Sequence, residues 1–276
     1  MSDVVSKGLN LIHGDCLEVL PTLEERSFDL VVTSPPYNIG IDYSSYEDGG
    51  SREEFLEWCL QWAAELKRVM ADDASFFLNV GAAPSNPLLP HQLLLALTDG
   101  AEPLFVLQNT FHWVKSITVE TREGESISAG HFKPINSKRF VNDCHEYVYH
   151  LTKDGKVSVD RKAAGVPYVD KSNIGRWGHS EGEDLRCRGN TWFIPYDTIR
   201  SREEQRPHPA TFPVALAERC IRLHGRGPKT RMIDPFLGIG STAIAAKHAG
   251  AESFVGIEID ESYLAAALER LKLIDA

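Results

Sequence analysis

Two short segments carry residue types suited to chemistry, although about two hundred residues separate them. The first reads Thr33-Ser34-Pro35-Pro36-Tyr37-Asn38, and the second reads Asp234-Pro235-Phe236-Leu237-Gly238-Ile239-Gly240-Ser241-Thr242. Each follows a short apolar run, which predicts a buried strand that ends in a loop. Ligands bind at the carboxyl ends of the strands in open α/β sheets. The two segments therefore predict one shared site, and their chemistry favours a group-transfer enzyme that acts on a flat, amine-bearing substrate.

The first segment offers hydrogen-bond acceptors on a rigid backbone. Pro35 and Pro36 fix φ, and they therefore fix the directions in which nearby carbonyl groups point. The Ser34 hydroxyl and the Pro35 carbonyl can both accept hydrogen bonds from an amino group, which localises the nitrogen lone pair and makes it nucleophilic. The Tyr37 ring offers a face for stacking. A Pro-Pro turn in an exposed loop is the alternative, but the strand before it and the second segment disfavour that interpretation.

The second segment predicts a cofactor site. Gly238 and Gly240 allow positive φ and a close approach of the backbone, and the helix predicted to follow favours an anionic group at its first turn. The next strand ends at Glu258, where an acid can accept hydrogen bonds from ribose hydroxyls. Ala243 replaces the third glycine of the dinucleotide motif, and this turn contains no Gly-Lys-Ser/Thr. An adenosine-type cofactor is therefore favoured over a dinucleotide or a nucleoside triphosphate.

The elements expected to position these segments alternate between strands and helices. Strands are predicted over 9–13, 28–33, 74–80, 104–113, 146–151, 231–236 and 253–258, and helices over 52–70, 88–97, 212–223, 241–248 and 261–273. Ser51 and Glu54 predict a capping box at the first of these helices. Such alternation predicts an α/β fold with a mostly parallel, doubly wound sheet of about seven strands. Residues 39–51 and 120–139 are expected to form loops, and residues 152–206 a loop-rich insertion without a long period.

Bulk composition excludes several classes of protein. The 276 residues can bury one sizeable core and carry a smaller module. Five scattered cysteines argue against a disulfide framework and a zinc site, and we expect no metal. None of them follows a proline, which disfavours nucleophilic attack on a pyrimidine ring carbon. The chain shows no signal segment and no apolar stretch of membrane-spanning length, so we expect a cytoplasmic protein without a membrane partner.

The charge is unevenly distributed along the chain. Residues 114–206 hold 16 Lys and Arg against 14 Asp and Glu, whereas the remainder holds 13 against 25, within a net charge of −10. The centre is therefore the part that can lie against phosphates without strong repulsion. Two solvated surfaces of different charge would give the same counts, so both interpretations stay open on charge alone.

The two segments together resemble the motifs of the DNA amino-methyltransferases, which use S-adenosylmethionine. The order of the motifs, catalytic first and cofactor last, is similar to the β-group permutation. His208-Pro209-Ala210-Thr211-Phe212-Pro213 resembles the segment that closes over the methionine moiety, and Gly256-Ile257-Glu258 resembles the ribose-binding strand end. Gly14-Asp15 resembles the turn whose acid contacts adenine. Asn142-Asp143-Cys144-His145-Glu146-Tyr147 resembles the motif that borders the pocket of the target base.

The resemblance implies a Rossmann-like methyltransferase with circularly permuted motifs and a specific set of site residues. The implied catalytic residues are Ser34, Pro35, Pro36 and Tyr37. The implied cofactor-binding residues are Asp15, Thr33, His208, Pro209, Ala210, Thr211, Asp234, Pro235, Phe236, Gly238, Gly240, Ser241, Thr242, Glu258 and Ile259. In this family Ser before Pro-Pro-Tyr usually accompanies N4-cytosine, whereas Asp or Asn accompanies N6-adenine. Ser34 therefore favours N4-cytosine, with N6-adenine as the alternative.

The resemblance also implies a division of the chain and a set of partners. Residues 1–152 and 207–276 are expected to form the catalytic domain, residues 114–142 a loop that contacts DNA, and residues 153–206 the target-recognition region. Candidate phosphate or base contacts are Lys133, Lys138, Arg139, Arg176, Arg186 and Arg188, although each alone could equally be a solvated surface charge. The base should flip out of double-stranded DNA to reach the site. A cognate restriction endonuclease is the implied functional partner, and the protein is expected to be a monomer or homodimer.

Two other functions remain open from the sequence. Methylation of an RNA or protein amine is one, because related Pro-Pro-Tyr motifs occur in such enzymes. A DNA-binding module with a vestigial cofactor pocket is the other. Its expected mark would be a broken Ser-Pro-Pro-Tyr motif or a broken glycine turn, and both are intact here.

Overall fold

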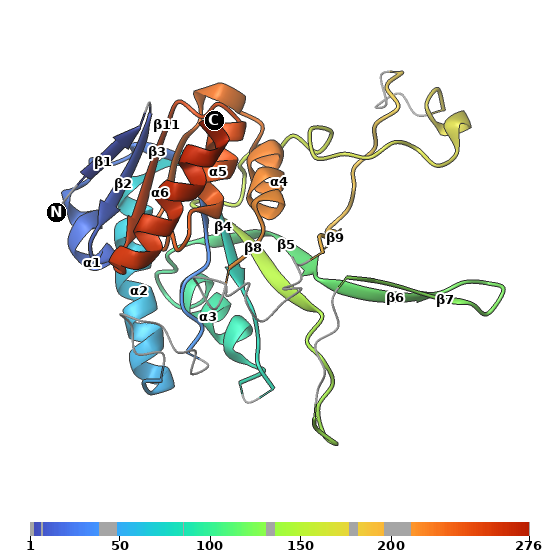
Figure 1. The fold of residues 1–276 in the computed structure, drawn as a ribbon, viewed down its shortest axis with the longest axis horizontal. Coiled ribbons are helices and arrows are strands. Elements are labelled where there is room, and N and C mark those ends of the chain that lie inside the picture. The colour runs from blue at the N-terminus through green and yellow to red at the C-terminus, as the bar shows by residue number, and fades with distance from the viewer. Residues whose placement is uncertain are drawn as a thin grey trace.

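The computed structural model describes residues 3–6, 8–38, 49–84, 86–130, 136–176, 182–195 and 211–275. Within them the chain forms an α/β fold around a nine-stranded sheet of order β1-β2-β11-β10-β3-β4-β8-β5-β9 (Figure 1). The strands are β1 (Asp3–Ser6), β2 (Leu9–His13), β3 (Phe28–Thr33), β4 (Met70–Val80), β5 (Val106–Val114), β8 (His145–Thr152), β9 (Thr191–Phe193), β10 (Arg231–Asp234) and β11 (Ser253–Glu258). β1 and β8 run antiparallel to their neighbours, and the other seven strands are parallel to one another.

All seven predicted strands are present, but the predicted count of about seven is too low. β1 and β9 add a short strand at each edge of the sheet. Four and three residues are too few to show the alternation on which a sequence-based prediction depends. The predicted loop at 120–139 is also partly wrong, because β6 (Ser116–Glu120) and β7 (Ser126–Gly130) pair as an antiparallel hairpin.

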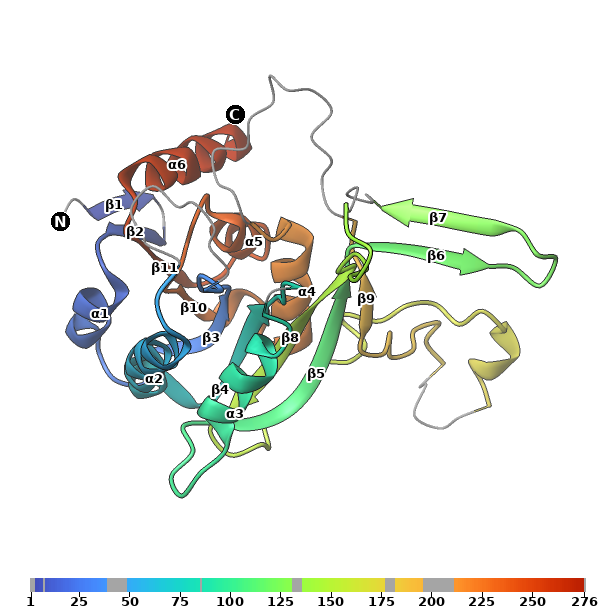
Figure 2. The ribbon, with the colours of Figure 1, turned by 90° about the horizontal axis from the view of Figure 1, so that it is seen from below.

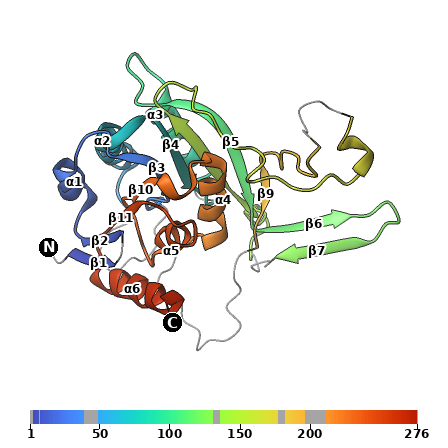
Figure 3. The ribbon, with the colours of Figure 1, turned by 90° about the horizontal axis from the view of Figure 1, so that it is seen from above.

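Helices cover both faces of the sheet. α1 (Cys16–Val19), α2 (Arg52–Val69) and α3 (Leu89–Thr98) contribute to one hydrophobic cluster, and α4 (Val214–His224), α5 (Ser241–His248) and α6 (Glu261–Asp275) to the other. Figure 3 shows the two groups of helices on opposite sides of the strands. This arrangement confirms the doubly wound α/β architecture. Among the described residues, no helix combines the length and the apolar character that a bilayer-spanning segment requires.

The capping residues and the apolar face of α2 agree with the sequence. The Ser51 side chain accepts from the Glu54 N–H, and the Glu54 carboxylate accepts from the Ser51 N–H, which completes the capping box. Phe55, Cys59 and Trp62 are buried at helical spacing against the sheet. The helix ends at Val69 because the next residue adopts an extended conformation and begins β4.

The order of the strands creates a topological switch point between β3 and β10, the position at which open α/β sheets form a ligand-binding crevice. From β3 the chain passes through α2 to β4, whereas from β10 it passes through α5 to β11, on the other side of the pair. α2 and α5 lie on opposite faces of the sheet. The loops that follow β3 and β10 therefore diverge, which leaves room for a ligand at a topological switch point.

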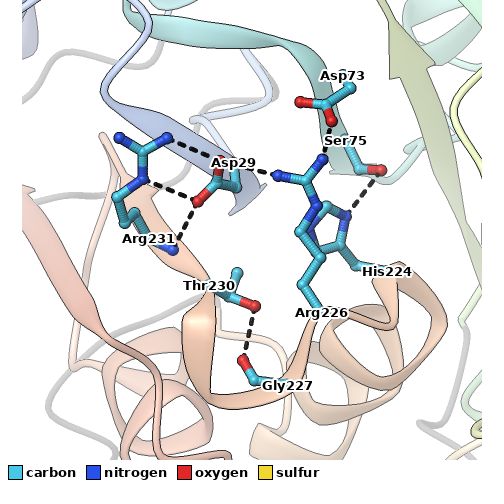
Figure 4. A network of polar contacts seen from close by, with 8 residues as sticks. All are labelled: Asp29, Asp73, Ser75, His224, Arg226, Gly227, Thr230 and Arg231. Carbon is cyan, nitrogen blue, oxygen red and sulfur yellow. Dashed lines mark hydrogen bonds and ion pairs between the residues drawn. The ribbon is translucent and has the colours of Figure 1, made fainter.

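A charged network fixes the opposite, amino-terminal ends of these strands (Figure 4). The Asp29 carboxylate on β3 accepts from Arg231 of β10 through Nε at 2.9 Å, Nη2 at 2.8 Å and the backbone N–H at 3.0 Å. Arg226 donates to Asp29 at 3.0 Å and also pairs with Asp73 of β4. The network therefore joins three neighbouring strands to the segment that follows α4.

Two segments project away from the sheet at the β5–β9 edge. The β6–β7 hairpin is one, and the chain around a 3-10 helix at Lys171–Asn173 is the other, as Figures 1 and 2 both show. The base of the second segment is closed by backbone hydrogen bonds between Val166 and Arg186. Residues just outside this closure, such as Ala164 and Trp192, are buried in the main core. The projecting part, between Val166 and Arg186, is therefore shorter than the loop-rich insertion predicted over residues 152–206.

Candidate active site between β3 and β10

The two sequence segments meet at the carboxyl edge of the sheet. Met232 and Ile233 of β10 lie opposite Leu30 and Val31 of β3 in a parallel register, so the two strands end side by side. Thr33, the last residue of β3, donates its hydroxyl hydrogen to Asp234 Oδ1 at 2.6 Å. This buried bond joins the first residue of one segment to the first residue of the other. The two segments therefore begin side by side at one edge of the sheet.

The Ser-Pro-Pro-Tyr segment forms a compact turn after β3. Pro35 and Tyr37 are buried, whereas Ser34 and Pro36 are half-buried. Ser34 Oγ lies 2.6 Å from Tyr37 Oη, so the two hydroxyls share a hydrogen bond. Asn38 ends the turn at a φ of 51°, a left-handed conformation that asparagine tolerates better than most residues. Tyr37 is only 8% exposed, so little of its ring is available for the stacking expected from the sequence. Its hydroxyl, by contrast, makes several hydrogen bonds.

Three polar residues that were not among the predicted site residues surround these hydroxyls. Asn79 at the end of β4 donates from Nδ2 to Tyr37 Oη at 2.8 Å and to Glu146 Oε2 at 2.7 Å. Glu146 of β8 accepts from Tyr37 Oη at 3.1 Å. Lys115, just after β5, pairs with Glu146 Oε1 at 2.6 Å. The signal available in the sequence was an asparagine in a buried run and an acid within the Asn142–Tyr147 motif.

The glycine turn after β10 is closed onto β11. Gly238 and Gly240 adopt φ values of 54° and 80°, in the left-handed region that favours glycine. A Cβ at Gly240 would lie 2.9 Å from Ala267 Cβ, so the turn also requires close packing against α6. Gly238 donates its N–H to Glu258 Oε2 at 2.7 Å, and Leu237 donates its N–H to the Ile257 carbonyl at 2.9 Å. Ser241 and Thr242 begin α5, as predicted, and both are buried.

Burial shifts the acids of this crevice toward their protonated forms. Burial raises the pKa of Asp234 to about 6, although hydrogen bonds from Thr33, Thr242 and the Phe236 N–H act in the opposite direction. Burial likewise raises the pKa of Glu258 to about 7; the N–H groups of Asp260 and Gly238 lower it, and the nearby acids raise it further. Two buried acids with raised pKa values beside a glycine turn favour a ligand that brings hydroxyl donors or positive charge.

The expected adenine-contacting acid lies at the neighbouring strand end. Asp15 caps α1 by accepting from the Leu17 N–H at 2.8 Å. Its neighbour Gly14 donates to the Glu258 carbonyl at 2.9 Å, and His13 bonds to the Ile259 carbonyl at 3.0 Å. The ends of β2 and β11 are thus joined, and Asp15, Glu258 and Ile259 lie along one edge.

An aromatic group stabilises the start of the glycine turn. The Phe236 ring lies 5.2 Å from the Trp62 ring and 5.5 Å from the Trp58 ring, in tilted and edge arrangements that aromatic pairs prefer. Pro235 beside it is buried. Trp58 and Phe236 are half-buried, so this group lies at the border of the core.

The remaining predicted site residues are either outside the described part of the chain or on its surface, apart from Thr211. His208, Pro209, Ala210 and Lys133 lie outside the described residues, and Thr211 is half-buried just before α4. Lys138, Arg139, Arg176, Arg186 and Arg188 are exposed. Arg188 donates from Nε to the Ala164 carbonyl at 3.1 Å, so its guanidinium group supports the base of the projecting segment.

The fold and the site together define a class of protein. A doubly wound sheet holds a glycine turn, two buried acids and a Ser-Pro-Pro-Tyr turn in one crevice, which is the arrangement of a Rossmann-like transferase. Comparison with known proteins makes this specific, because residues 28–269 match the DNA methylase family N6_N4_Mtase. The chain belongs to this family, which confirms the resemblance drawn from the motifs.

Two curated relatives align over nearly the whole chain. Type II methyltransferase M.ScaI of Streptomyces caespitosus is 34% identical over 278 residues, which cover 95% of this chain and 81% of the relative. The DNA adenine methyltransferase YhdJ of Escherichia coli strain K12 is 27% identical over 265 residues, which cover 95% and 82%. The alignments include the insertion as well as the core.

Solved structures share the fold. The PvuII DNA methyltransferase, described as cytosine-N4-specific, aligns with a TM-score of 0.69 at 21% identity, over 95% of this chain and 86% of that chain. A putative DNA modification methylase from Thermus thermophilus, complexed with S-adenosyl-L-methionine, aligns with a TM-score of 0.60 at 23% identity, over 95% and 94%. These likenesses confirm the expected methyltransferase fold.

Proposed function

We propose that this DNA methylase transfers a methyl group from S-adenosylmethionine to the exocyclic N4 amine of a cytosine flipped out of double-stranded DNA. The observation that carries the proposal is the joining of the Ser34 turn to the glycine turn through the Thr33–Asp234 bond. This bond places the hydrogen-bond acceptors for an amine at the same edge as the residues suited to an adenosine-type cofactor.

The residues of the crevice fit S-adenosylmethionine. Glu258 and Asp15 lie where hydroxyl and amine donors of the cofactor would need acceptors, and each carboxylate has lone pairs beyond those its backbone bonds use. The left-handed turn at Gly238 and Gly240 keeps side chains away from the backbone that a ligand would approach. When bound, S-adenosylmethionine supplies an electrophilic methyl group. The Thermus thermophilus relative with the same fold was solved with this molecule.

The chain's own residues orient the amine. The Ser34 hydroxyl and the Pro35 carbonyl accept hydrogen bonds from the amino group, which localises its lone pair for attack. Much of the acceleration comes from holding two reactants in line, a contribution of about 7–11 kcal/mol in well-oriented systems. Burial of Pro35 and Tyr37 keeps this turn rigid and excludes water from its inner side.

Ser34 supports cytosine over adenine as the target. The PvuII relative, which shares the fold, is described as specific for cytosine N4. YhdJ, described as an adenine methyltransferase, keeps adenine N6 as the alternative target. Chemistry is the same for both amines, so the base is decided by the pocket around Ser34 rather than by a different mechanism.

The projecting segments support duplex DNA as the substrate. Between residues 165 and 190 the sequence holds four lysines and arginines against four aspartates and glutamates, whereas the β6–β7 hairpin holds one against three. The segment is therefore the projection that can approach phosphates with less repulsion. The segment between 165 and 190 is our proposed target-recognition element. M.ScaI is named as a type II methyltransferase, which supports a role in protecting DNA from a restriction endonuclease of the same specificity.

The test measures transfer of labelled methyl groups to plasmid DNA from a methylation-deficient host, with RNA and protein extract as competing substrates. Nucleosides from the labelled DNA, separated by mass spectrometry, should contain N4-methylcytosine. N6-methyladenine would assign the alternative base, and label in RNA or protein alone would refute a DNA substrate.

Ser34→Ala should lower the turnover number about 100-fold, because an acceptor of the reacting amine is lost. The dissociation constant for S-adenosylmethionine should stay within about twofold of the wild-type value. Ser27→Ala is the matched control, because Ser27 lies at the amino end of the same strand and its hydroxyl bonds to the Glu24 carbonyl. Full turnover by Ser34→Ala would show that the hydroxyl has no part in transfer.

A further inference from the structure

The Ser34 hydroxyl is the first member of a hydrogen-bonded chain that runs through a carboxylate to a lysine. Ser34 Oγ lies 2.6 Å from Tyr37 Oη, Tyr37 Oη lies 3.1 Å from Glu146 Oε2, and Glu146 Oε1 lies 2.6 Å from Lys115 Nζ. The four residues come from the loop after β3, from β8 and from the end of β5. A connected chain of this kind beside the proposed methyl acceptor requires an explanation beyond stability.

The chemistry of the end groups decides which hydroxyl donates to which. An ionised carboxylate only accepts, and an amide NH₂ group only donates. Tyr37 Oη therefore donates its single hydrogen to Glu146 and accepts from Asn79 Nδ2. Because the Tyr37 hydrogen is already used, Ser34 must be the donor in the Ser34–Tyr37 bond. Ser34 Oγ also accepts from Asn79 Nδ2 at 3.3 Å, so Ser34 keeps a lone pair, and no hydrogen, for a ligand at this edge of the sheet.

Asn79 fixes the direction of these hydrogen bonds, and its own carbonyl oxygen is left without a partner in the described part of the chain. That oxygen is buried, while the Nδ2 atom donates to Tyr37 and Glu146. A buried unsatisfied acceptor costs about 1–3 kcal/mol. The opposite amide orientation would place its oxygen against the Glu146 carboxylate. The observed orientation is therefore set by Glu146 as well.

The centre of this hydrogen-bonded chain is closely packed and largely buried. Asn79 is 3% exposed and Tyr37 is 8% exposed, and a Cβ at Gly81 would lie 3.1 Å from both Glu146 and Tyr37 side-chain atoms. Hydrogen bonds in such surroundings are stronger than in water, and neighbouring bonds polarise one another. The glycine allows Glu146 and Tyr37 to approach each other closely.

We propose that Glu146 is a positioning residue which, through Tyr37, makes Ser34 an obligate hydrogen-bond acceptor for the target amine and receives the proton that the amine releases. This inference rests on the proposed function. The amine nitrogen forms its bond to the methyl carbon as the carbon–sulfur bond breaks, and that electron pair stays on sulfur. The alkylated amine then gives a proton to Ser34 Oγ, Ser34 gives its own to Tyr37, and Tyr37 gives its own to Glu146, which later releases it to solvent.

The test is a double-mutant cycle on Glu146→Gln and Tyr37→Phe, with labelled methyl transfer to plasmid DNA. Both changes preserve shape, and either one interrupts the chain. We expect each to lower the turnover number about 10- to 100-fold, within or just below the range of positioned proton transfer. The dissociation constant for S-adenosylmethionine and the KM for DNA should change less than about twofold. The double variant should lose little more than either single variant, because both act through one chain.

Glu57→Gln is the matched control, because it removes one carboxylate from an exposed position on α2. Its turnover should equal that of the wild type. Losses that multiply in the double variant, or an unchanged turnover number in Glu146→Gln, would overturn the proposed chain. Failure of the proposed function has a different result, in which the wild-type protein itself transfers no label to DNA. Tyr37→Phe, which keeps the buried ring, reports on the chain even if Glu146→Gln folds poorly.

Discussion

At the scale of single residues, the crevice depends on buried acids whose protonation is sensitive to what binds beside them. Glu258 uses its two oxygens to hold the Gly238 and Asp260 N–H groups, and burial raises its pKa to about 7. A hydroxyl that donates to this carboxylate stabilises its ionised form. Binding of a ribose should therefore release a proton near neutral pH, which couples cofactor affinity to pH.

We expect S-adenosylmethionine to bind the wild-type protein up to about tenfold more tightly at pH 8 than at pH 6, relative to Glu258→Gln. Isothermal titration calorimetry across this range provides the measurement. In the absence of cofactor the sign is opposite for stability, because a raised pKa means that the folded protein binds more protons between the ordinary value of 4.5 and about 7. Stability from this group is therefore lost as the pH rises through that window. Parallel affinity profiles for the two proteins would exclude Glu258 as the ribose contact.

The sequence was sufficient to predict site residues that are neighbours along the chain. It could not show contacts between residues that are distant in the sequence and meet only in the folded protein. Ser34, Tyr37 and the glycine turn follow strands directly, so their placement could be predicted from local pattern. Lys115 and Glu146 reach the site from β5 and β8, and their meeting depends on an antiparallel pairing of strands that no local pattern reveals.

At the scale of elements, the alternation of strands and helices predicted the doubly wound sheet. Long segments with apolar residues at strand or helix spacing identify the buried strands and helices. The short edge strands and the β6–β7 hairpin lack such periods, since the hairpin exposes Ile117, Val119 and Ile127 to solvent. Nor could the sequence show what joins the amino ends of β3 and β10. There, burial alone would raise the pKa of Asp29, but hydrogen bonds from Arg231 and the charges of Arg231 and Arg226 hold it below its ordinary value.

Asp29→Asn should lower the free energy of unfolding by about 2–4 kcal/mol at pH 7, because two arginines lose their shared charged partner. A group with a lowered pKa stabilises the fold above its unfolded value and loses this effect as the pH falls through its folded value. The difference between wild type and variant should therefore shrink below about pH 4. Chemical denaturation followed by circular dichroism measures both effects. Asp72→Asn, which removes two exposed ion pairs at 3.4 Å, should cost far less, and an equal loss would contradict a special role for Asp29.

At the scale of the whole molecule, two projections of different charge leave the sheet on its β5–β9 side. The β6–β7 hairpin holds Arg122 among Glu120, Glu123 and Glu125, whereas the segment between 165 and 190 holds four basic and four acidic residues. Phosphate contact favours the second projection, although the sequence had placed a DNA-contacting loop over 114–142. The net negative charge of the chain is compatible with DNA binding because the charge is unevenly distributed, and the segment between 165 and 190 carries no net negative charge.

The combined variant Arg176→Ala/Arg186→Ala should weaken binding of duplex DNA about 10- to 100-fold at low salt, while Arg122→Ala should have little effect. Each lost phosphate contact should reduce the salt dependence, so the slope of log affinity against log salt should become shallower by about 1.8. Arg188 is kept, because its bond to the Ala164 carbonyl supports the base of the segment. Fluorescence anisotropy across a salt series separates this electrostatic loss from misfolding, and unchanged cofactor affinity verifies an intact core. A larger loss in Arg122→Ala would instead assign DNA contact to the hairpin, since the two projections leave the sheet at the same edge and compete for the same role.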